Sequence, residues 1–591
     1  MNDYLLVISI GPVQSLIEAG RRTRDLWCGS WLLSEVSRAA ALHLHQRHNG
    51  CLIFPNPENP DEALQPQTDT LTESANIANV IRAQVSVESK EDLAVLVAET
   101  KKAAQNRLAD IFQQAYEKLK AHQIDQCIDP DSWQNQQQDM LEIFSAWVLV
   151  QNGDYKYASN RVGALLSARK NTRDFLPPSG AREVHKSSLD GANDSVLLKP
   201  NEQKLRRSLG LSGDELLDSL GVVKRLAGPS DQFTAFSRIV ANDWIESLSP
   251  ETLANLNSAY EILAEKNIAT RTKGNQDIYA SFPYDAEYLF TSRLEALADV
   301  EESDKTELLH LLNRLDSSPV PYGVLLKADG DHMGALLGKA EDAQASRTIS
   351  AALHKFASSV HSIVRDQKGQ AIYAGGDDVL AFVPLSQAFA CAKELATEFA
   401  RIMEPVAQPL LSGNDPYPTL SVGLAIGHFV QPMRQLRHRS VAAEKHAKGS
   451  IEQKPRKALA IHLGIRSGHD IQWRCRWDDK QTLNAMDQFI QAFSASELPS
   501  RISQDLREMS LRLRWTHDDS ISESDRIGIQ TSELQRMLAR ARLPGQSDAK
   551  ISPTLKTEIQ SLAQELSLSE LADLLLIARW LSGKTQTDIG A

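Results

Sequence analysis

Residues 374–378 read Ala-Gly-Gly-Asp-Asp, and they join the apolar run 371–373 to the apolar run 379–383. A glycine pair between two strand-like runs predicts a hairpin turn. A second acidic stretch, Asp329-Gly330-Asp331, follows the buried-strand run 324–326. We therefore expect four carboxylates at the ends of neighbouring strands, and this acidic hairpin decides the fold prediction.

The segments around the hairpin follow a recognisable order. A helix with apolar residues at helical spacing is expected between 349 and 364, a second helix over 386–403, and a further strand over 419–426. The resulting order β-α-β-β-α-β is the ferredoxin-like plan. A helix over 441–448 and an additional strand over 458–461 follow. This is the layout of a palm domain for metal-dependent nucleotidyl transfer, so we expect the chemistry between residues 320 and 465.

Paired divalent ions, Mg²⁺ or Mn²⁺, about 4 Å apart can acidify an attacking 3′-hydroxyl and neutralise charge at the α-phosphate of a nucleotide. Magnesium binds through one or two carboxylates together with phosphates and water. Adjacent strand residues point to opposite faces, so Asp377 and Asp378 do not bind one ion unless the turn distorts the strand. We predict Asp377 as the direct metal ligand, Asp329 facing it, and Asp378 and Asp331 assisting.

Nucleotide contacts are predicted at the glycines and at one lysine. Gly330, Gly375 and Gly376 leave room for the nucleotide, and the hairpin glycines can adopt positive φ. Lys448, at the end of its helix, is a candidate phosphate contact, although a solvated helix-end lysine is the commoner case. The Gly-Gly-Asp-Asp sequence alone also fits an ordinary hairpin loop whose aspartates cap backbone amides.

Four stretches together carry a family resemblance. The opening Ile8–Gln14 and Arg22–Ser30 segments, the 329–334 segment and the 374–378 hairpin resemble the Cas-ten (palm/cyclase) family, the large subunits of type III-B CRISPR Cmr effector complexes. The resemblance implies an α+β fold with two ferredoxin-like palm domains that alternate with two helical domains. It also implies synthesis of cyclic oligoadenylate from ATP once guide RNA has paired with target RNA, in a cytoplasmic complex with other Cmr subunits.

The domain prediction follows this plan. We expect a degenerate palm over 1–170, a mainly helical linker over 171–318, the catalytic palm over 319–470 and a C-terminal helical bundle over 471–591. The first palm strand, Tyr4–Ile10, ends in Gly11-Pro12 and carries no aspartate pair. The first palm is therefore interpreted as a palm without metal chemistry that forms the other wall of the nucleotide site.

Two departures from the family pattern affect the expected activities. The first palm strand begins almost at Met1, so we expect no His-Asp nuclease domain, and the dipeptides His469-Asp470 and His517-Asp518 are expected to be surface residues. Ser187 and Asp190 stand where the family often carries a Cys-x-x-Cys half-site, so no zinc is expected. Lys224-Arg225 resembles a linker element of the family, to which we assign no function.

The net charge of −12 over 591 residues argues against coating nucleic acid by bulk attraction. RNA contacts are therefore expected to be local or made through partner subunits, with the basic cluster Arg434–Lys457 favoured for triphosphate or RNA. Five widely spaced cysteines indicate reduced thiols in the cytoplasm. No stretch approaches the roughly 20 apolar residues of a membrane span, so no membrane partner is expected.

Three functions remain open from the sequence. The leading one is the cyclic oligoadenylate synthase. In the second, the same palm joins ATP to another acceptor, such as S-adenosylmethionine. In the third, the palms only hold guide RNA and sister subunits together. Four crowded acids favour catalysis, because unpaired like charges are costly to hold together and a scaffold does not need them.

Overall fold

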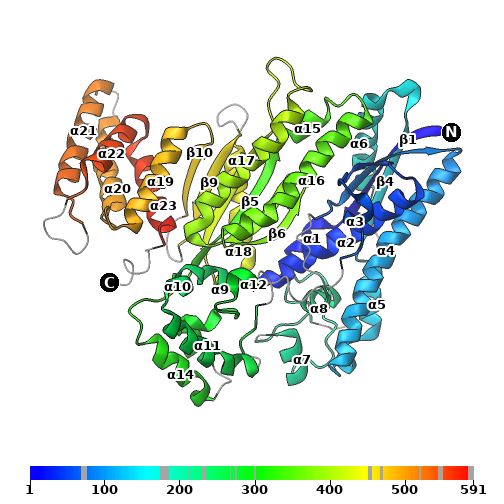
Figure 1. Ribbon diagram of the computed structural model, residues 1–591, viewed down its shortest axis with the longest axis horizontal. Coiled ribbons are helices and arrows are strands. Elements are labelled where there is room, and N and C mark those ends of the chain that lie inside the picture. Colours follow the sequence, from blue (N-terminus) through cyan, green and yellow to red (C-terminus); the bar gives the residue numbers. More distant parts are fainter. Residues whose placement is uncertain are drawn as a thin grey trace.

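The computed structural model describes most of the chain. The described residues are 1–67, 76–172, 185–211, 213–228, 234–266, 268–272, 276–297, 301–449, 456–465, 470–517, 521–543 and 550–583. Two of the residues discussed above, His469 and Asp518, lie outside this part. The first palm and the C-terminal helices occupy opposite ends of the molecule, with the second palm between them (Figure 1).

The second palm is built on a six-stranded sheet of order β10-β9-β8-β5-β7-β6. Its strands are β5 (Tyr322–Asp331), β6 (Gln370–Gly375), β7 (Asp378–Val383), β8 (Thr419–His428), β9 (Ala458–Leu463) and β10 (Ile471–Arg476), and its helices are α15 (Met333–Leu337), α16 (Ala343–Asp366), α17 (Ala388–Ala407) and α18 (Met433–Lys448). The inner order β8-β5-β7-β6 is antiparallel throughout, and β9 adds to β8 in parallel. The ferredoxin-like plan is confirmed.

Alternation along β5 separates the core from the site. Val324, Leu326 and Ala328 are fully buried in one hydrophobic cluster with residues of α16 and α17. The intervening residue Leu325 belongs to a different cluster, shared with the first palm and the linker. Because side chains alternate between the faces of a strand, Asp329 continues the face of Leu325 and is placed away from the α16 and α17 core.

The first palm repeats the same topology with a smaller sheet. Its strands are β1 (Asn2–Gly11), β2 (Leu52–Phe54), β3 (Val80–Val87) and β4 (Glu142–Leu149), in the order β2-β3-β1-β4. Its helices are α1 (Val13–Glu18), α2 (Thr23–Arg47), α3 (Pro60–Ala63), α4 (Lys90–Ala121), α5 (Pro130–Gln138) and α6 (Tyr155–Asn171). All its strand pairs are antiparallel, so both palms share the ferredoxin-like order.

The amphipathic segment from residue 13 to 46 forms two helices, α1 and α2, instead of one long helix. Arg22 has an extended backbone and precedes α2, and the Asp25 carboxylate accepts hydrogen bonds from the Arg21 and Arg22 N–H groups at 2.9 and 3.0 Å. These bonds satisfy N–H groups that would otherwise be unpaired at the start of a helix. The Asp25 side chain therefore caps the start of α2 after the turn.

The two palms contact each other beside the acidic hairpin. Asn76 donates its backbone N–H to the Ala374 carbonyl at 2.9 Å, and its side-chain oxygen accepts from the Ala374 N–H at 3.0 Å. On α16, Arg347 donates to the carbonyls of Leu52 and Gly50 at 2.9 and 3.0 Å. The outer strand of the hairpin is thus tied to the first palm.

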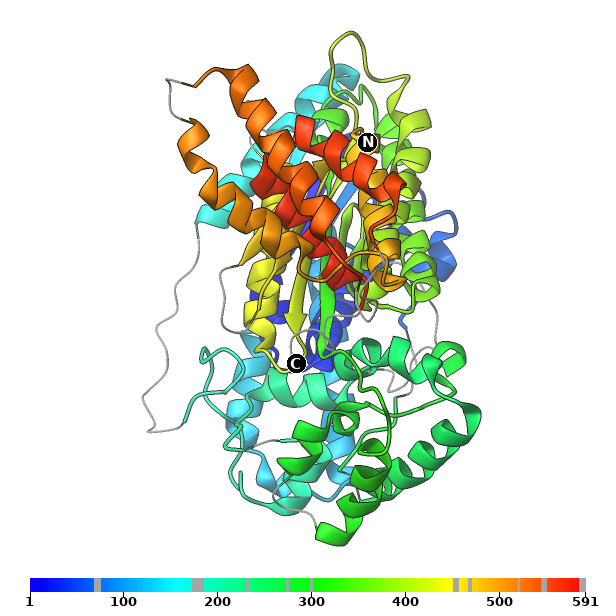
Figure 2. The ribbon, with the colours of Figure 1, turned by 90° about the vertical axis from the view of Figure 1, so that its left-hand side faces the viewer.

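The remaining segments are mainly helical, as expected. The linker contains α7 (Gln203–Leu209), α8 (Ser219–Leu226), α9 (Phe236–Val240), α10 (Asn242–Ser247), α11 (Pro250–Glu265), α12 (Gln276–Tyr279), α13 (Thr291–Glu295) and α14 (Glu302–Leu312). The C-terminal bundle contains α19 (Lys480–Ser494), α20 (Ile502–Arg512), α21 (Glu523–Arg540), α22 (Pro553–Glu565) and α23 (Leu568–Leu581). Both views place the linker along one side of the palms, below them in Figures 1 and 2.

The expectation of a purely helical segment from residue 471 is corrected by β10. This strand pairs antiparallel with β9 over 471–476 and therefore belongs to the sheet of the second palm. Its sequence alternates, with Trp473 and Cys475 buried and the arginine that follows each of them partly exposed. Six residues with only a half-buried pattern give a weak strand signal beside long amphipathic helices.

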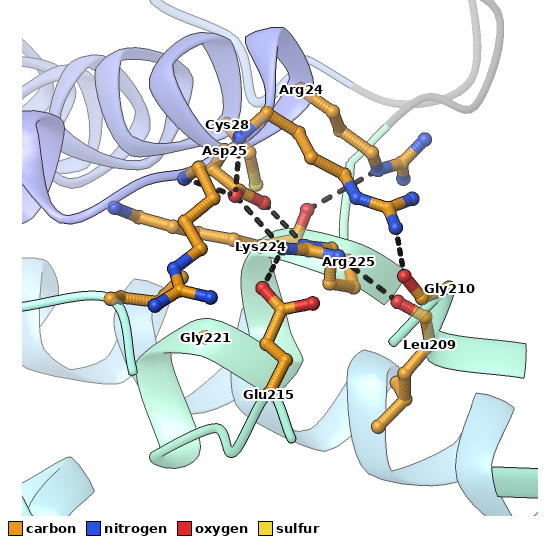
Figure 3. Close-up of polar contacts among 12 residues, drawn as sticks. Arg24, Asp25, Cys28, Leu209, Gly210, Glu215, Gly221, Lys224 and Arg225 are labelled. Atoms are coloured by element: carbon orange, nitrogen blue, oxygen red, sulfur yellow. Dashed lines mark hydrogen bonds and ion pairs between the residues drawn. The ribbon is translucent and has the colours of Figure 1, made fainter. Parts of the chain in front are cut away.

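A buried ionic cluster, named here the Arg225 cluster and consisting of Asp25, Glu215 and Arg225, joins α2 to α8 (Figure 3). Arg225 bonds both Asp25 oxygens at 2.5 and 3.0 Å and a Glu215 oxygen at 3.0 Å. Arg24 donates from the same helix turn to the carbonyls of Lys224 and Ala227, each at 3.2 Å. Lys224-Arg225 therefore fixes the linker to the first palm.

The position where the family often carries cysteines is a tight turn. The Ser187 N–H donates to the Asn193 carbonyl at 2.9 Å, and the Ala192 N–H donates to the Asp190 carboxylate at 2.9 Å. All five cysteines of the chain are buried and free of disulfides. The expectation that this turn holds no zinc stays a prediction.

Candidate active site

Asp377 and Gly330 lie against each other in the acidic site. Asp377 lies in the two-residue turn between β6 and β7, since Gly375 pairs with Asp378. A Cβ atom placed on Gly330 would lie 2.6 Å from Asp377 Oδ2 and 2.7 Å from its Cβ. The Asp377 side chain therefore packs directly on the β5 backbone, beside Asp329.

Two lysines neutralise the neighbouring acids. The Lys327 ammonium lies 2.9 Å from Asp378 Oδ1, and Lys448 forms an ion pair with Asp329 and a second one with Glu444 at 3.3 Å. Lys448 is 21% exposed, so it is held at the site and is not a freely solvated helix end. Its contact with a phosphate stays a prediction.

Asp331 is oriented toward β8, which lies on the side of β5 opposite to the hairpin. Its Oδ2 accepts from the Thr419 and Ser421 hydroxyls at 2.8 and 2.7 Å and from the Lys457 N–H at 3.2 Å, and the side chain is completely buried. Asp331 therefore anchors β8 and the segment before β9. Its assistance in metal binding stays a prediction.

The two hairpin glycines serve different purposes. Of the pair, Gly376 adopts the left-handed φ of +68° that the turn requires. Gly375 has no positive φ, and a Cβ there would collide with the Tyr373 ring. The prediction of positive φ thus holds for Gly376, whereas Gly375 is required because the Tyr373 ring lies on it.

Burial raises the pKa of Asp377 to about 7, and the Asp329 and Asp378 carboxylates add to this, while Lys448 opposes it. An ionised Asp377 is therefore unfavourable in this environment. A divalent cation at the carboxylates would reverse this, because it supplies the missing positive charge.

The donor set fits a magnesium or manganese ion that a nucleotide completes. Among the described residues, no three His, Cys, Asp or Glu side chains form a metal cage by themselves. Magnesium does not need one, since it binds through one or two carboxylates plus phosphates and water. Asp329 and Asp377 are the residues that would hold it.

We expect the metal-free protein to lose stability relative to its Asp377→Asn variant as pH rises from about 4 to about 7. The folded pKa near 7 exceeds the ordinary value of about 3.9, so in this window the folded state holds a proton that the unfolded chain has lost. Unfolding temperatures measured in a chelator test this.

Magnesium provides the matched measurement. At the upper end of that pH range it should stabilise the wild type and have little effect on Asp377→Asn. Asp366→Asn is the control, because the Asp366 side chain is 69% exposed. Parallel pH profiles for wild type and Asp377→Asn would contradict the proposed electrostatics.

Three contributors were not predicted from the sequence. Lys327 precedes Asp329 by two residues. Because residues two apart on a strand share a face, the sequence alone could have predicted that Lys327 lies beside Asp329. Tyr373 and Phe54 flank the hairpin glycines, with Phe54 coming from the first palm, 3.7 Å from the position of a Gly376 Cβ. No local pattern places Phe54 there, because the contact joins distant segments.

The basic cluster favoured for RNA is largely engaged within the chain. Arg437 pairs with Glu18 of the first palm, Arg439 with Asp470 at 3.1 Å, and Arg456 lies 3.6 Å from Asp331. Arg434 is exposed. An RNA contact by this cluster stays a prediction.

Two palms of one topology, of which the second carries the acidic hairpin, define a two-palm protein with a nucleotidyltransferase-like fold. Residues 322–460 match the family model of the Cas10/Cmr2 second palm domain, and residues 5–116 match that of the N-terminal domain of the CRISPR-associated protein Cmr2. These two matches to Cas10/Cmr2 family models confirm the family resemblance drawn from the sequence.

Individual relatives agree with this assignment. The CRISPR system Cmr subunit Cmr2 of Pyrococcus furiosus is 22% identical over 554 residues, covering 78% of this chain and 62% of that protein. A chain in the cryo-EM structure of type III-B Cmr-beta in the apo state has a TM-score of 0.66 at 13% identity, covering 94% of this chain and 78% of that one.

The structure of Cmr-beta bound to cognate target RNA gives a TM-score of 0.60 at 12% identity, with 94% of this chain and 80% of that one covered. At these identities the likeness concerns the fold.

Within the described part of the chain, no helix is both long and apolar enough to cross a membrane.

Proposed function

We propose that this chain is a metal-dependent nucleotidyltransferase that makes a cyclic oligoadenylate from ATP. The observation that carries the proposal is the packing of the Asp377 carboxylate on the Gly330 backbone beside Asp329, with its pKa raised to about 7. Perturbed carboxylates are typical of sites where charge is used in chemistry.

Each residue has a distinct part in this proposal. A bound divalent cation, held by Asp329 and Asp377, would acidify the attacking 3′-hydroxyl and neutralise the α-phosphate. Lys448 exchanges its bond to Asp329 for a phosphate oxygen. Lys327 pairs with Asp378 at the edge of the site. The hydroxyl releases its proton to water and its oxygen bonds to the α-phosphorus. The bond from the α-phosphorus to the oxygen that bridges to the β-phosphate breaks, and pyrophosphate leaves.

The proposal extends to the assembly in which the reaction takes place. We propose that the chain works in a type III-B ribonucleoprotein with other Cmr subunits, guide RNA and target RNA, and that RNA pairing triggers synthesis. The fold likeness to a chain of Cmr-beta and the match to Cmr2 support this. The net charge of −12 agrees with RNA contacts made mostly through partners.

We expect Asp377→Ala combined with Asp378→Ala to abolish the product while assembly persists. The double variant removes the turn carboxylate and its neighbour, which leaves Asp329 as the remaining acid beside the hairpin. The assembled complex with guide RNA, matching RNA, labelled ATP and Mg²⁺ or Mn²⁺ is assayed by mass spectrometry. Lys102→Ala, at an exposed position on α4, serves as the control.

The outcomes separate the alternatives. A cyclic oligoadenylate supports the proposal, whereas an adenylylated acceptor such as S-adenosylmethionine would keep the site and change its substrate. Unaltered product formation by the double variant would exclude this site. Absence of any product from the intact wild-type complex would favour a scaffold.

A further inference from the structure

A pocket lies between the palms, away from the acidic hairpin. We name it the interpalm pocket; it has a volume of about 480 Å³. Its lining comes from α2, from the 57–67 segment of the first palm and from residues 351–358 of α16. Asp329, Asp377, Asp378 and Lys448 do not line it. Its α16 residues lie roughly two to four turns from the start of that helix.

The innermost polar group of the interpalm pocket is the Arg38 guanidinium. Arg38 is 2% exposed, and its Nε donates to Glu35 Oε1 at 2.9 Å while Nη1 donates to the Ala63 carbonyl. Its Nη2 is buried without a hydrogen-bond partner. A buried guanidinium nitrogen without a partner is costly, because the bonds it makes to water in the unfolded chain are not replaced.

The charge around Arg38 does not balance. Glu35, whose side chain is completely buried, is shared between Arg38 and Arg107, and the Arg107 side chain is itself only 10% exposed. One carboxylate thus faces two guanidinium groups, which leaves a formal surplus of one positive charge. Buried charges are normally paired, so this surplus calls for an anion.

The other pocket walls suit an oxyanion with a polar body. His354 and Lys355 of α16 line the opposite side, and amide side chains of Asn59 and Gln65 lie at the mouth. Burial lowers the pKa of His354, to which Arg38 contributes, so the imidazole is neutral near pH 7 and can donate one hydrogen bond. The acidic residues there, Glu58 and Glu62, are exposed and screened by water.

We infer that the interpalm pocket binds a small phosphate-bearing molecule whose phosphate pairs with Arg38 and Lys355 and whose remaining part contacts both palms. A planar guanidinium matches phosphate oxygens in geometry and charge. The pocket volume falls in the range of small-ligand sites, about 300 to 1,000 Å³. This site is separate from the proposed catalytic centre and does not depend on its activity.

Calorimetric titrations of the full chain test the inference. The protein carries Asp377→Ala with Asp378→Ala and is kept in a chelator, so that the acidic site binds no metal nucleotide. Inorganic phosphate, adenosine monophosphate and adenosine are the probes. We expect saturable binding of the two phosphate-bearing probes and none of adenosine. Tighter binding of adenosine monophosphate than of phosphate assigns a nucleotide, and equal binding assigns the phosphate group alone.

Variants locate the site. Lys355→Glu reverses a wall charge, and Ala351→Trp fills the pocket without changing charge; each should weaken binding by about tenfold or more. Lys102→Glu makes the same charge change at an exposed position on α4 and should have no effect. Both test variants alter accessible positions, so they spare the buried Glu35 and Arg38 pair. Absence of phosphate binding, or binding unchanged by both variants, would overturn the inference.

Discussion

Gly330→Ala is expected to reduce nucleotide product formation by about a hundredfold, because displacement of a catalytic group by about 1 Å costs that much. The added Cβ would lie 2.7 Å from the Asp377 Cβ and 2.6 Å from its carboxylate. The first of these atoms is not the end of a flexible side chain, so the whole turn has to shift. Product formation by the assembled complex, measured at saturating ATP, tests this.

Gly334→Ala is the matched control for that substitution. Gly334 lies four residues further on, in the exposed part of α15, and a Cβ there has no neighbour within 4 Å. Alanine is preferred over glycine in a helix by about 1 kcal/mol, so the control should keep full activity. Equal activities of the two variants would show that Asp377 does not need its position against β5.

The palm topology could be predicted because it depends on local patterns. The amphipathic spacing that forms α16, the glycine pair of the hairpin and the apolar run that forms β8 are each visible within a short window. Elements stabilised by distant partners were missed or shortened. The helix expected over 441–448 begins at Met433, two turns earlier. Its first turns are basic, and two of these arginines pair with Glu18 and Asp470.

The candidate site also has some features that the sequence predicts and others that it does not. Asp329 lies close enough to Asp377 to raise its pKa, in agreement with the expectation that adjacent strand ends converge. The partners of Asp331 could not be predicted, because they depend on the register that pairs it with Thr419 on β8. Asn76 and Phe54 reach the hairpin from the first palm, and a single sequence contains no signal for contacts between domains.

The linker of this protein depends on charge pairing at one point, and Arg225→Met should destabilise it strongly. Asp25, Glu215 and Arg225 have side chains at most 3% exposed. Removing the arginine takes its guanidinium away from two buried carboxylates, which costs about 3–5 kcal/mol. For a domain of this size the unfolding temperature should fall by about 10 °C, as measured by calorimetry at pH 7.

Arg293→Met is the matched control, because it removes an arginine paired with Glu287 whose side chains are 43% and 35% exposed. Exposed pairs contribute about 0–1 kcal/mol, so little change is expected.

The pH dependence of the destabilisation distinguishes lost charge pairing from lost side-chain packing. Burial would raise the pKa of Asp25, but Arg225 lowers it overall, so the stabilisation is present above the unfolded value and is lost as pH falls through the folded one. The deficit of Arg225→Met should therefore shrink as pH falls below about 4. A deficit that is constant with pH would assign the effect to lost packing of the side chain.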